Sequence, residues 1–519
     1  MQQTNSNDIA LEDAKNTIAI FSTTMAFSIA IVYYIARIGF DNPILPILKT
    51  LSLSSFLLLL PQGYRFFSQK LQLNIKPSWL NCDAAISLWG LIIIIFLGIV
   101  ASYLNLNLFI LIFCIGFLLL AINYIIFWQP GTTRQNFRFI LVTILFSLYI
   151  ASFKYGTGYL NPLFTEGLIQ KNAHIDQLFH AAISNIIKTY GIPSTGIDGL
   201  VYLPYHYGSH WLFAHLSSLL NMEILIFYQL AYPVIIVPFF FQKILEFSFD
   251  FRRKFINDSV DIKLRINWLL WFIFFLGFLG FIPRVLSFQA GFWVFSPLSA
   301  ESHVTAFAIS FMAFSLALQV NINSLYHNNI SWIEAILPAL VLPCLISTVA
   351  ILKISVGVLL FCVSIYLVVR FKLYKSKVYV TSLFILTVMF ATAFLLAKNP
   401  SPSPFKLFAF IQDWVEDPWK PFWFHLTFFW SWIYIIFVVK MKNIKNIKDF
   451  ITAINQFMVI DIEVILLLCI VGAAPGMLLQ IGGGSAYYFT DFQIVFSLSL
   501  LIANIPNIKT FSNKVYEKR

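Results

Sequence analysis

The run of residues 83 to 102 decides the fold class. It reads DAAISLWGLIIIIFLGIVAS, and Asp83 is the one charged residue in it. At 1.5 Å per residue, a helix of this length reaches across a hydrocarbon core of about 30 Å. Because only helices and closed barrels satisfy every backbone polar group in lipid, this run predicts a transmembrane α-helix.

The composition of the whole chain extends this prediction to many such helices. Of its 519 residues, 59% are hydrophobic and 11% are charged. Soluble proteins have about 45–50% apolar and about 25% charged residues. The chain leaves no room for a large water-soluble domain. We therefore expect an all-α, polytopic transmembrane helical bundle that forms a single integral membrane domain over residues 1–519.

Apolar runs of membrane-spanning length recur along the chain, and we count about fourteen of them. They lie near residues 17–36, 43–61, 83–102, 108–127, 139–153, 222–242, 268–283, 303–320, 332–350, 354–370, 378–397, 422–439, 459–478 and 490–505. The apolar stretch 211–220 is left out, because counting it as a span would reverse the side on which every later loop lies.

The basic residues predict the orientation, because Lys and Arg in short loops accumulate on the cytoplasmic side. They cluster in residues 65–76, 134–138, 243–265, 370–377, 440–448 and 509–519. Both termini are then cytoplasmic. This bias explains the net charge of +11, so we do not expect a nucleic-acid partner.

The cysteines and the N-terminus carry no further signal. The five cysteines show no CxxC spacing and lie in or beside apolar runs, so we expect them to be packing residues. Residues 1–16 are polar and lack the basic region that opens a signal peptide, so we expect the first span to be retained.

The predicted outer side receives one connection that is too long to be a simple turn. The chain from 154 to 221 forms an outer-face loop on a protein otherwise made of short connections. Long loops in compact proteins are usually functional or disordered, and this one is too apolar and too regular for disorder. We expect the chemistry to lie there.

Within this loop, residues 166–190 repeat with the period of an amphipathic helix. Ile175, Leu178, Phe179, Ala182, Ile183 and Ile186 fall on one side, and Asp176, Gln177, His180, Ser184 and Lys188 fall on the other. Gly191 and Pro193 supply a stop signal. Such a helix holds polar groups over a membrane-embedded cavity, or it is only a surface anchor.

The next segment, YLPYHYGSHW at residues 202–211, contains two histidines and three tyrosines. If Pro204 opens a helix, His206 and His210 project from one face, as Asp176 and His180 do on theirs. Imidazole and carboxylate groups together can bind a divalent metal ion such as Mg, Mn or Zn, or such a group of side chains can bind a phosphate. The alternative is that these residues are hydrogen-bonded aromatic anchors at the membrane interface.

Two later segments add candidates for substrate binding. Lys353 stands between two apolar runs, where it either neutralises a phosphate or simply finishes a helical hairpin. The loop QIGGGSAYYFTD at 480–491 combines three glycines with Tyr487 and Tyr488. Its backbone could approach an anion and its tyrosines could stack on a sugar, or it is a flexible turn.

The order Asp176-x-x-x-His180, Gly191-Ile-Pro193 and Tyr205-His206-Tyr207-x-x-His210, followed by a run of leucines, resembles the membrane-embedded glycosyltransferases of the GT-C superfamily. In such enzymes an acidic residue on an outer-face helix stands over a cavity that receives a polyprenyl-phosphate-linked sugar. The resemblance implies that Asp176 is the catalytic or metal-binding carboxylate and that His180 is its neighbour. By position, it implies phosphate, metal or sugar contacts from Tyr205, His206, His210, Lys353, Tyr487 and Tyr488.

The mechanism that this resemblance implies needs few groups. A carboxylate deprotonates an acceptor hydroxyl, while cations or a bound metal stabilise the phosphate leaving group. We therefore expect transfer of a sugar from a polyprenyl-phosphate-linked donor to an acceptor at the outer face of the cell membrane. Membrane lipid and the lipid-linked sugar are the expected partners.

Three other functions stay open. A transporter or flippase of lipid-linked glycans would place charges deep in the helical bundle. An O-antigen polymerase or ligase would depend on arginines in the outer loops, of which this chain has few. A metal-ion permease would continue the histidines and carboxylates across the bilayer.

Overall fold

The structure, a computed structural model, describes residues 6–72, 78–104, 106–127, 133–155, 163–173, 175–196, 199–255, 301–321, 331–397, 405, 407, 428–479 and 488–516. Within these ranges the regular elements are helices, and strand-like pairing is limited to one isolated bridge between Phe405 and Leu479. The contacts divide the chain into two compact units, which are described separately. Unit 1 is Met1–Phe247, Ser259–Phe278 and Leu298–Val320, and unit 2 is Ser248–Asp258, Leu279–Pro297 and Asn321–Arg519.

Nine helices in the described part of the chain are long and apolar enough to cross a membrane, which confirms an all-helical chain rich in membrane-length helices. They are Lys15–Arg37, Ile44–Lys70, Asp83–Leu104, Phe109–Ile126, Ile224–Phe255, Glu301–Leu318, Trp332–Leu352, Lys377–Ala397 and Ile460–Leu478. Four more of the expected spans coincide with the shorter apolar helices Phe139–Leu148, Ile354–Arg370, Phe429–Met441 and Asp491–Asn504. The expected span at 268–283 lies outside the described residues, so the total of about fourteen stays a prediction.

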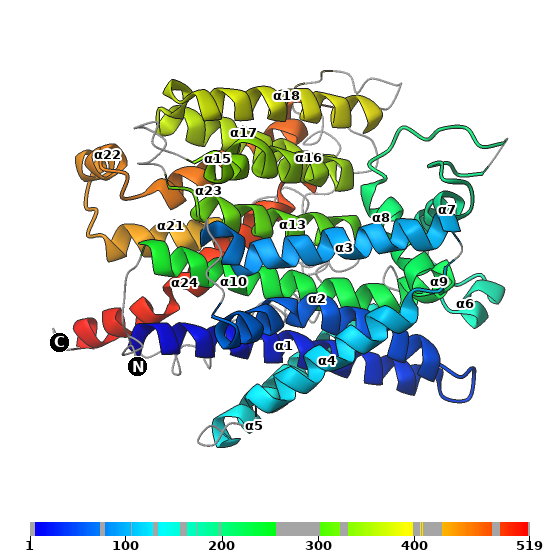
Figure 1. The fold of residues 1–519 in the computed structure, drawn as a ribbon. Coiled ribbons are helices and arrows are strands. Elements are labelled where there is room, and N and C mark those ends of the chain that lie inside the picture. The colour runs from blue at the N-terminus through cyan, green and yellow to red at the C-terminus, as the bar shows by residue number, and fades with distance from the viewer. Residues whose placement is uncertain are drawn as a thin grey trace. The chain divides into compact units, whose positions relative to one another are not determined.

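Unit 1 is built around helices that run alongside one another. Its elements are α1 (Ser6–Arg37), α2 (Ile44–Lys70), η1 (Ser78–Asn81), α3 (Asp83–Leu104), α4 (Phe109–Phe127), α5 (Thr133–Lys154), α6 (Thr165–Ile169), α7 (Ile175–Tyr190), α8 (Gly208–Leu219), α9 (Ile224–Ile226), η3 (Phe227–Ile236), α13 (Glu301–Leu318) and the part of α10 (Val237–Phe255) that ends at Phe247. Figure 1 shows α1, α2, α3 and α10 side by side, with α6, α7 and α8 gathered at one end of them. We call this the α7 end and the opposite one the Lys243 end.

Close approach between helices depends on small residues in two places. A Cβ at Gly98 of α3 would lie 2.7 Å from the backbone oxygen of His215 in α8. At Gly116 of α4, a Cβ would collide with the backbone oxygen of Ser52 in α2. Small residues of this kind let membrane helices pack backbone to backbone. Because Gly98 has no side chain, α8, one of the helices at the α7 end, packs directly against α3.

The segments α9, η3 and α10 form one continuous helix through unit 1, and its central part is a π-helix around Pro233. Proline has no N–H to donate, and its ring crowds the carbonyl four residues earlier, so a regular α-helical turn cannot form there. That carbonyl belongs to Gln229, and it accepts a hydrogen bond of 3.0 Å from the Tyr155 hydroxyl instead. The wider π turn thus keeps the helix continuous while its backbone groups stay satisfied.

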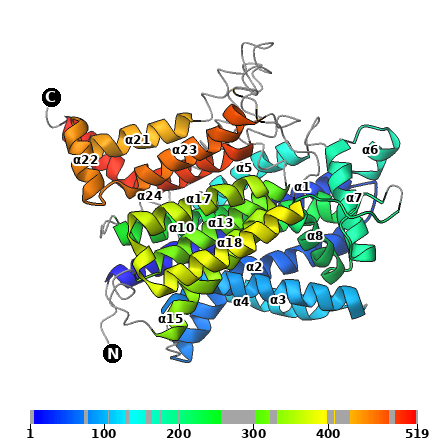
Figure 2. The same cartoon turned by 90° about the horizontal axis from the view of Figure 1, so that it is seen from above.

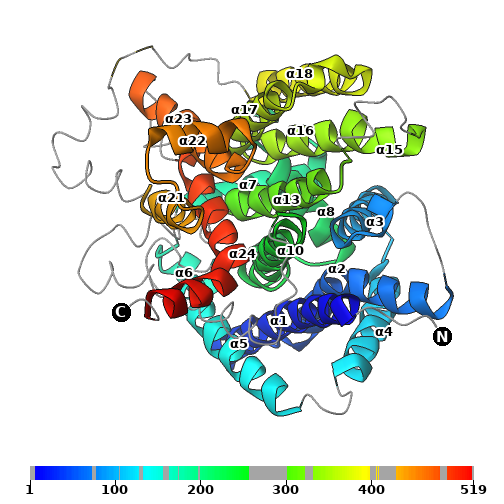
Figure 3. The ribbon, with the colours of Figure 1, turned by 90° about the vertical axis from the view of Figure 1, so that its left-hand side faces the viewer.

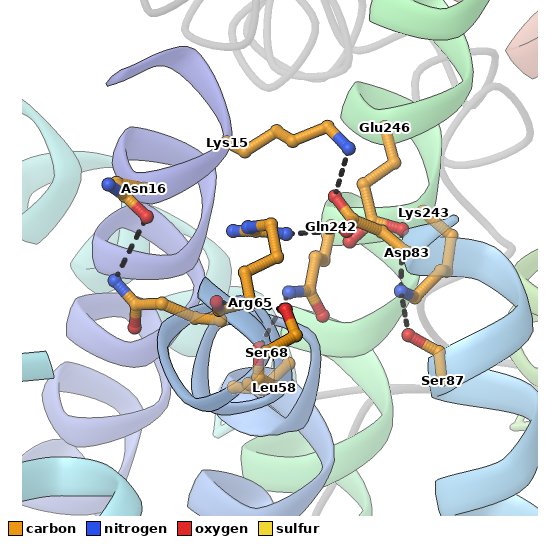
Figure 4. A network of polar contacts seen from close by, with 11 residues as sticks. Lys15, Asn16, Leu58, Arg65, Ser68, Asp83, Ser87, Gln242, Lys243 and Glu246 are labelled. Atoms are coloured by element: carbon orange, nitrogen blue, oxygen red, sulfur yellow. Dashed lines mark hydrogen bonds and ion pairs between the residues drawn. The ribbon is translucent and has the colours of Figure 1, made fainter. Parts of the chain in front are cut away.

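Ion pairs join helices at the Lys243 end, where four helices meet (Figure 4). The Lys243 side chain is 1% exposed, and its Nζ donates to Ser87 Oγ and to Glu246 Oε2, each at 2.6 Å. Asp83, the first residue of α3, pairs with Arg65 Nη1 at 2.5 Å and with Lys15 Nζ at 3.1 Å. These contacts join α1, α2, α3 and α10.

Two glutamines complete this polar layer. Gln242 Nε2 donates to the backbone oxygen of Leu58 at 2.8 Å, and Gln62 Nε2 donates to Asn16 Oδ1 at 3.3 Å. Every charge in the layer therefore lies beside an opposite charge, as the burial of Lys243, Glu246 and Asp83 requires. The two ion pairs of Asp83 join α1 and α2 to α3, and the hydrogen bond from Lys243 to Ser87 joins α10 to α3, so a shift along any of these helices would break a contact.

We expect Lys243→Met to destabilise the protein in detergent by about 3–5 kcal/mol, because it leaves Glu246 buried beside no direct cation. Thermal unfolding of the purified variant measures the change. Lys448→Met, at an exposed lysine, is the matched control and should leave the unfolding temperature nearly unchanged. A double variant, Lys243→Met with Glu246→Leu, should recover part of the loss. An unfolding temperature equal to wild type in Lys243→Met would show that the layer does not hold the helices.

Unit 2 contains two groups of neighbouring helices. The first consists of α15 (Trp332–Ile336), η5 (Leu337–Val341), α16 (Leu342–Leu352), α17 (Ile354–Arg370), η6 (Leu373–Lys375) and α18 (Lys377–Ala397), and Figure 3 shows α16, α17 and α18 side by side. The second consists of α21 (Phe429–Met441), α22 (Ile447–Asn455), α23 (Ile460–Leu478) and α24 (Asp491–Tyr516), and Figure 2 shows α21, α23 and α24 together. An ion pair of 2.6 Å between Arg370 and Glu463 ties α17 to α23.

Candidate functional site

Helix α7 carries two of the predicted site residues, Asp176 and His180, in its first two turns. Its buried side includes Ile183 and Ile187, which pack on Ala214 of α8. The predicted division into an apolar and a polar side is partly wrong, because Gln177 and Ser184 of the predicted polar side are buried and Ile175 of the predicted apolar side is 76% exposed. Asp176 is exposed and His180 is half-buried. The helix ends at Tyr190, and Gly191 follows with φ of +73°, which confirms the predicted stop.

The prediction of one continuous helix over residues 166–190 is wrong. The chain forms two helices, because α6 ends at Ile169 and Lys171 adopts a left-handed backbone with φ of +58°. The Lys171 N–H donates to Leu168 O at 3.1 Å and the Asn172 N–H donates to Gly167 O at 2.8 Å, so the end of α6 is closed by its own backbone. Glycine usually occupies a position with this left-handed backbone. Because the chain has a lysine there, the sequence gives no signal for the break.

The expectation that Pro204 opens a helix is also wrong. Residues 201–207 are not helical, and α8 begins at Gly208. The Leu203 N–H donates to Pro193 O at 2.8 Å, which ties the segment to the turn after α7. His206 therefore precedes the helix that contains His210, and the two imidazoles do not share one helical face.

His210 contacts His180 instead. His180 Nδ1 lies 2.8 Å from His210 Nε2, a hydrogen-bond distance between side chains 30 residues apart in sequence. His210 is only 2% exposed. The packing of α7 on α8 thus brings together one histidine from each of the two predicted pairs.

Aromatic rings surround this pair. The Tyr205 ring centroid lies 6.2 Å from that of His180, 5.8 Å from that of His210 and 3.8 Å from that of His206. Four predicted site residues, Tyr205, His206, His180 and His210, therefore form one cluster at the α7 end, which we call the histidine cluster. A cluster of rings with one hydrogen-bonded imidazole pair suits proton transfer or the recognition of a polar ligand.

The described residues do not gather the expected metal ligands. No group of three His, Cys, Asp or Glu side chains within them stands close enough to hold a metal ion. The direct contact between His180 and His210 occupies one nitrogen atom of each ring. A metal ion held by Asp176, His180, His206 and His210 stays a prediction.

The sequence analysis did not identify Tyr228, which lies in the π-helix η3 and contacts α7. Its hydroxyl lies 2.8 Å from Ser184 Oγ and donates to the backbone oxygen of His180 at 3.2 Å. Tyr228 therefore holds the turn of α7 that carries His180. In the sequence it reads as an ordinary aromatic residue at the start of an apolar run.

Glu301 is a second carboxylate at the α7 end. It is the first residue of α13, is 4% exposed, and interacts electrostatically with Tyr228 and Tyr232. Helix α13 packs on both α8 and η3, the elements that hold His210 and Tyr228. Its position in the sequence, beside His303 at the predicted outer rim, already made it a candidate, but the sequence did not predict its closeness to Tyr228.

Two further groups fix the surroundings of the histidine cluster. Lys188 of α7 donates to Met222 O at 2.7 Å, and burial lowers its pKa while Glu223 opposes that shift. Burial also lowers the pKa of His215, whose ring lies 4.4 Å from that of Trp211. Burial therefore favours the neutral form of His215.

In unit 2, Lys353 lies where the sequence predicted it, between two helices. It is an extended residue at the joint of α16 and α17, is 6% exposed, and its Nζ is 4.2 Å from the centre of the Tyr488 ring. Asp491, which is 3% exposed, interacts with it electrostatically. Two predicted binding residues from distant segments thus meet, whereas Tyr487 lies outside the described residues.

No protein-family model, curated protein sequence or solved structure matches this chain. The similarity to GT-C glycosyltransferases therefore stays an expectation based on the residues of the 160–220 region.

We expect Tyr228→Phe to loosen α7 at the turn that carries His180. The variant keeps the ring but removes a hydroxyl with two buried partners, a loss of about 1–3 kcal/mol. Amide hydrogen exchange in α7 should accelerate by about tenfold or more, while exchange in α18 stays unchanged. Tyr374→Phe, at an exposed tyrosine of unit 2, is the matched control. Equal exchange in all three proteins would contradict the role of Tyr228.

Proposed function

We propose that the chain is a membrane glycosyltransferase that moves a sugar from a polyprenyl-phosphate-linked donor to an acceptor at the outer face of the membrane. The observation that carries the proposal is the 2.8 Å contact between His180 and His210, which makes α7 and α8 one site. Around that contact lie a tyrosine ring and a second imidazole, at the end of a bundle of apolar helices. A lipid-linked substrate suits this setting, since its tail needs apolar helices and its head needs polar side chains.

The proposed chemistry begins with the acceptor hydroxyl. In the tautomer in which His180 Nδ1 donates to His210, the other ring nitrogen of His180 carries a lone pair and can accept a proton. Asp176 lies one helical turn before His180, so its carboxylate can stabilise the imidazolium that forms. The Asp176 carboxylate is the other candidate acceptor for this proton. As the acceptor oxygen bonds to the anomeric carbon of the sugar, the bond from that carbon to the phosphate oxygen breaks and the polyprenyl phosphate leaves.

Lys353 is proposed as a phosphate contact in unit 2. It precedes the first turn of α17, where the positive end of the helix dipole also favours an anion. Its ammonium lies over the Tyr488 ring and beside Asp491, so it is held in place before any ligand arrives. An arriving phosphate would add a second anion to a buried lysine and would strengthen its charged form.

The membrane arrangement belongs to the same proposal. We infer about fourteen spans, both termini in the cytoplasm, and the histidine cluster on the outer side of the cell membrane. The support is the concentration of lysine and arginine in alternate loops, including the loops at 65–76, 370–377 and 440–448.

One observation favours a second candidate, a transporter or flippase of lipid-linked glycans. At the Lys243 end, Lys243, Glu246 and Asp83 are buried and Lys15 and Arg65 are half-buried where four membrane-length helices meet. Ionisable groups at membrane depth often mark transport pathways. In the described residues, however, each of these groups lies within ion-pair distance of another, which suits a structural role equally well.

Mass analysis of lipid-linked and surface glycans from source cells tests the proposal. Cells carry wild type, a deletion, Asp176→Asn or His180→Ala, with the variants expressed at matched levels in the membrane. We expect one sugar to be lost in the deletion and to fall by at least about 100-fold in both variants, as for the loss of a general base or its partner. Cys344→Ala, at a half-buried packing residue, should leave the glycans unchanged.

The outcomes separate the parts of the proposal. Unchanged glycans in the deletion would contradict the transferase and favour transport of another substrate. A sugar missing in the deletion and present in Asp176→Asn would remove Asp176 from the reaction, and Glu301→Gln would be the next variant to compare.

A further inference from the structure

Helix α22 lies in the connection between two apolar helices of unit 2. Helix α21 ends at Met441 and the candidate span Ile460–Leu478 begins 19 residues later. Figures 1 and 2 show α22 lying across the ends of α21 and α23 rather than alongside them. If α21 and α23 cross the membrane, α22 therefore lies in the plane of its surface.

An apolar stripe on α22 faces away from the protein. Ile447 and Ile451, one turn apart on one face, are 75% and 51% exposed, whereas Ala453 is buried. Met458, three residues after the helix, is also exposed. Three exposed apolar side chains on one short segment are the pattern of a helix that inserts its apolar face into the headgroup layer.

Lysines flank this stripe. Lys440, Lys442, Lys445 and Lys448 are all exposed, and Asp449 is the single acidic residue from 440 to 449. The Asp449 carboxylate accepts a hydrogen bond from the Lys445 N–H at 2.9 Å, so it stabilises the chain where the helix begins. The surface around the stripe is therefore strongly positive.

The helix is held rigidly on its other side. Asn446 caps its first turn by accepting from the Asp449 N–H at 2.9 Å. Arg370 of α17 donates to the backbone oxygen of Ile454, lies 4.2 Å from the centre of the Phe457 ring, and pairs with Glu463. These contacts fix the position of α22, so its stripe and its lysines keep one orientation relative to α21 and α23.

We propose that α22 and its flanking lysines form a docking surface for the anionic headgroups of membrane lipids. Ile447, Ile451 and Met458 enter the interface, and the lysines contact phosphate groups around it. Each lysine near a negatively charged membrane surface contributes about a fivefold gain in affinity. This surface does not depend on the glycosyltransferase proposal, because it lies outside both candidate sites.

A spin label at position 451 tests the docking surface in the full-length protein. Ile451→Cys is made in a chain whose five native cysteines are replaced, and the labelled protein is placed in nanodiscs of phosphatidylcholine alone or with added phosphatidylglycerol. We expect the anionic lipid to lower the accessibility of the label to a water-soluble relaxing agent by severalfold. Neutralising three lysines, in Lys440→Gln with Lys445→Gln and Lys448→Gln, should abolish the lipid effect.

Two controls make the result decisive. A label at Thr452→Cys, on the polar side of α22, should stay accessible in every nanodisc. Lys372→Gln with Lys375→Gln and Lys377→Gln removes three exposed lysines from another turn of unit 2 and should leave the lipid effect at position 451 intact. Equal accessibility with and without anionic lipid, or an equal loss in both triple variants, would overturn the proposal. A label at position 451 that is shielded in native membranes but not in anionic nanodiscs would also overturn the proposal and would indicate a protein partner.

Discussion

The pairing of Lys243 with Glu246 and Ser87 is the contact on which the arrangement of unit 1 depends. A lysine that is 1% exposed inside a membrane-length helix is tolerated only beside an opposite charge. The partners come from α3 and from α10 itself, and Asp83 extends the layer to α1 and α2. The apolar faces of these helices allow many registers, since lipid-like surfaces slide past one another at little cost. The ion pairs of Asp83 and the hydrogen bond from Lys243 to Ser87 select one of them.

The same helix connects this layer to the histidine cluster. From Lys243 back to Tyr228, the continuous segment of η3 and α10 covers a rise of about 22 Å. At that far end, Tyr228 holds α7 through Ser184 and the carbonyl of His180. The π turn around Pro233 lies between them and is supported by Tyr155. The α7 end therefore rests on the same rigid element that the Lys243 end fixes, which is the preorganisation that a site for transfer chemistry needs.

Several features could be predicted from sequence because they depend on local chemistry. Apolar length predicts the helices, Gly191 predicts the end of α7, and the position of Lys353 between two apolar runs predicts a helix joint. What could not be predicted depends on packing. His180 meets His210 only because α7 lies on α8, and periodicity alone paired His210 with His206. Lys171 ends α6 without a glycine, and the closeness of Glu301 to Tyr228 joins segments that are distant in sequence.

The central claim is that the histidine cluster receives the polar head of a lipid-linked sugar. Photo-crosslinking tests it most directly, with p-benzoylphenylalanine in place of Tyr205 in living cells and mass analysis of the adduct. The ring at this position lies within 6.2 Å of the His180 ring. The account predicts an adduct that contains a polyprenyl phosphate sugar at position 205 and none at position 374, an exposed tyrosine of unit 2. Adducts with ordinary phospholipid alone, or equal glycan adducts at both positions, would contradict it.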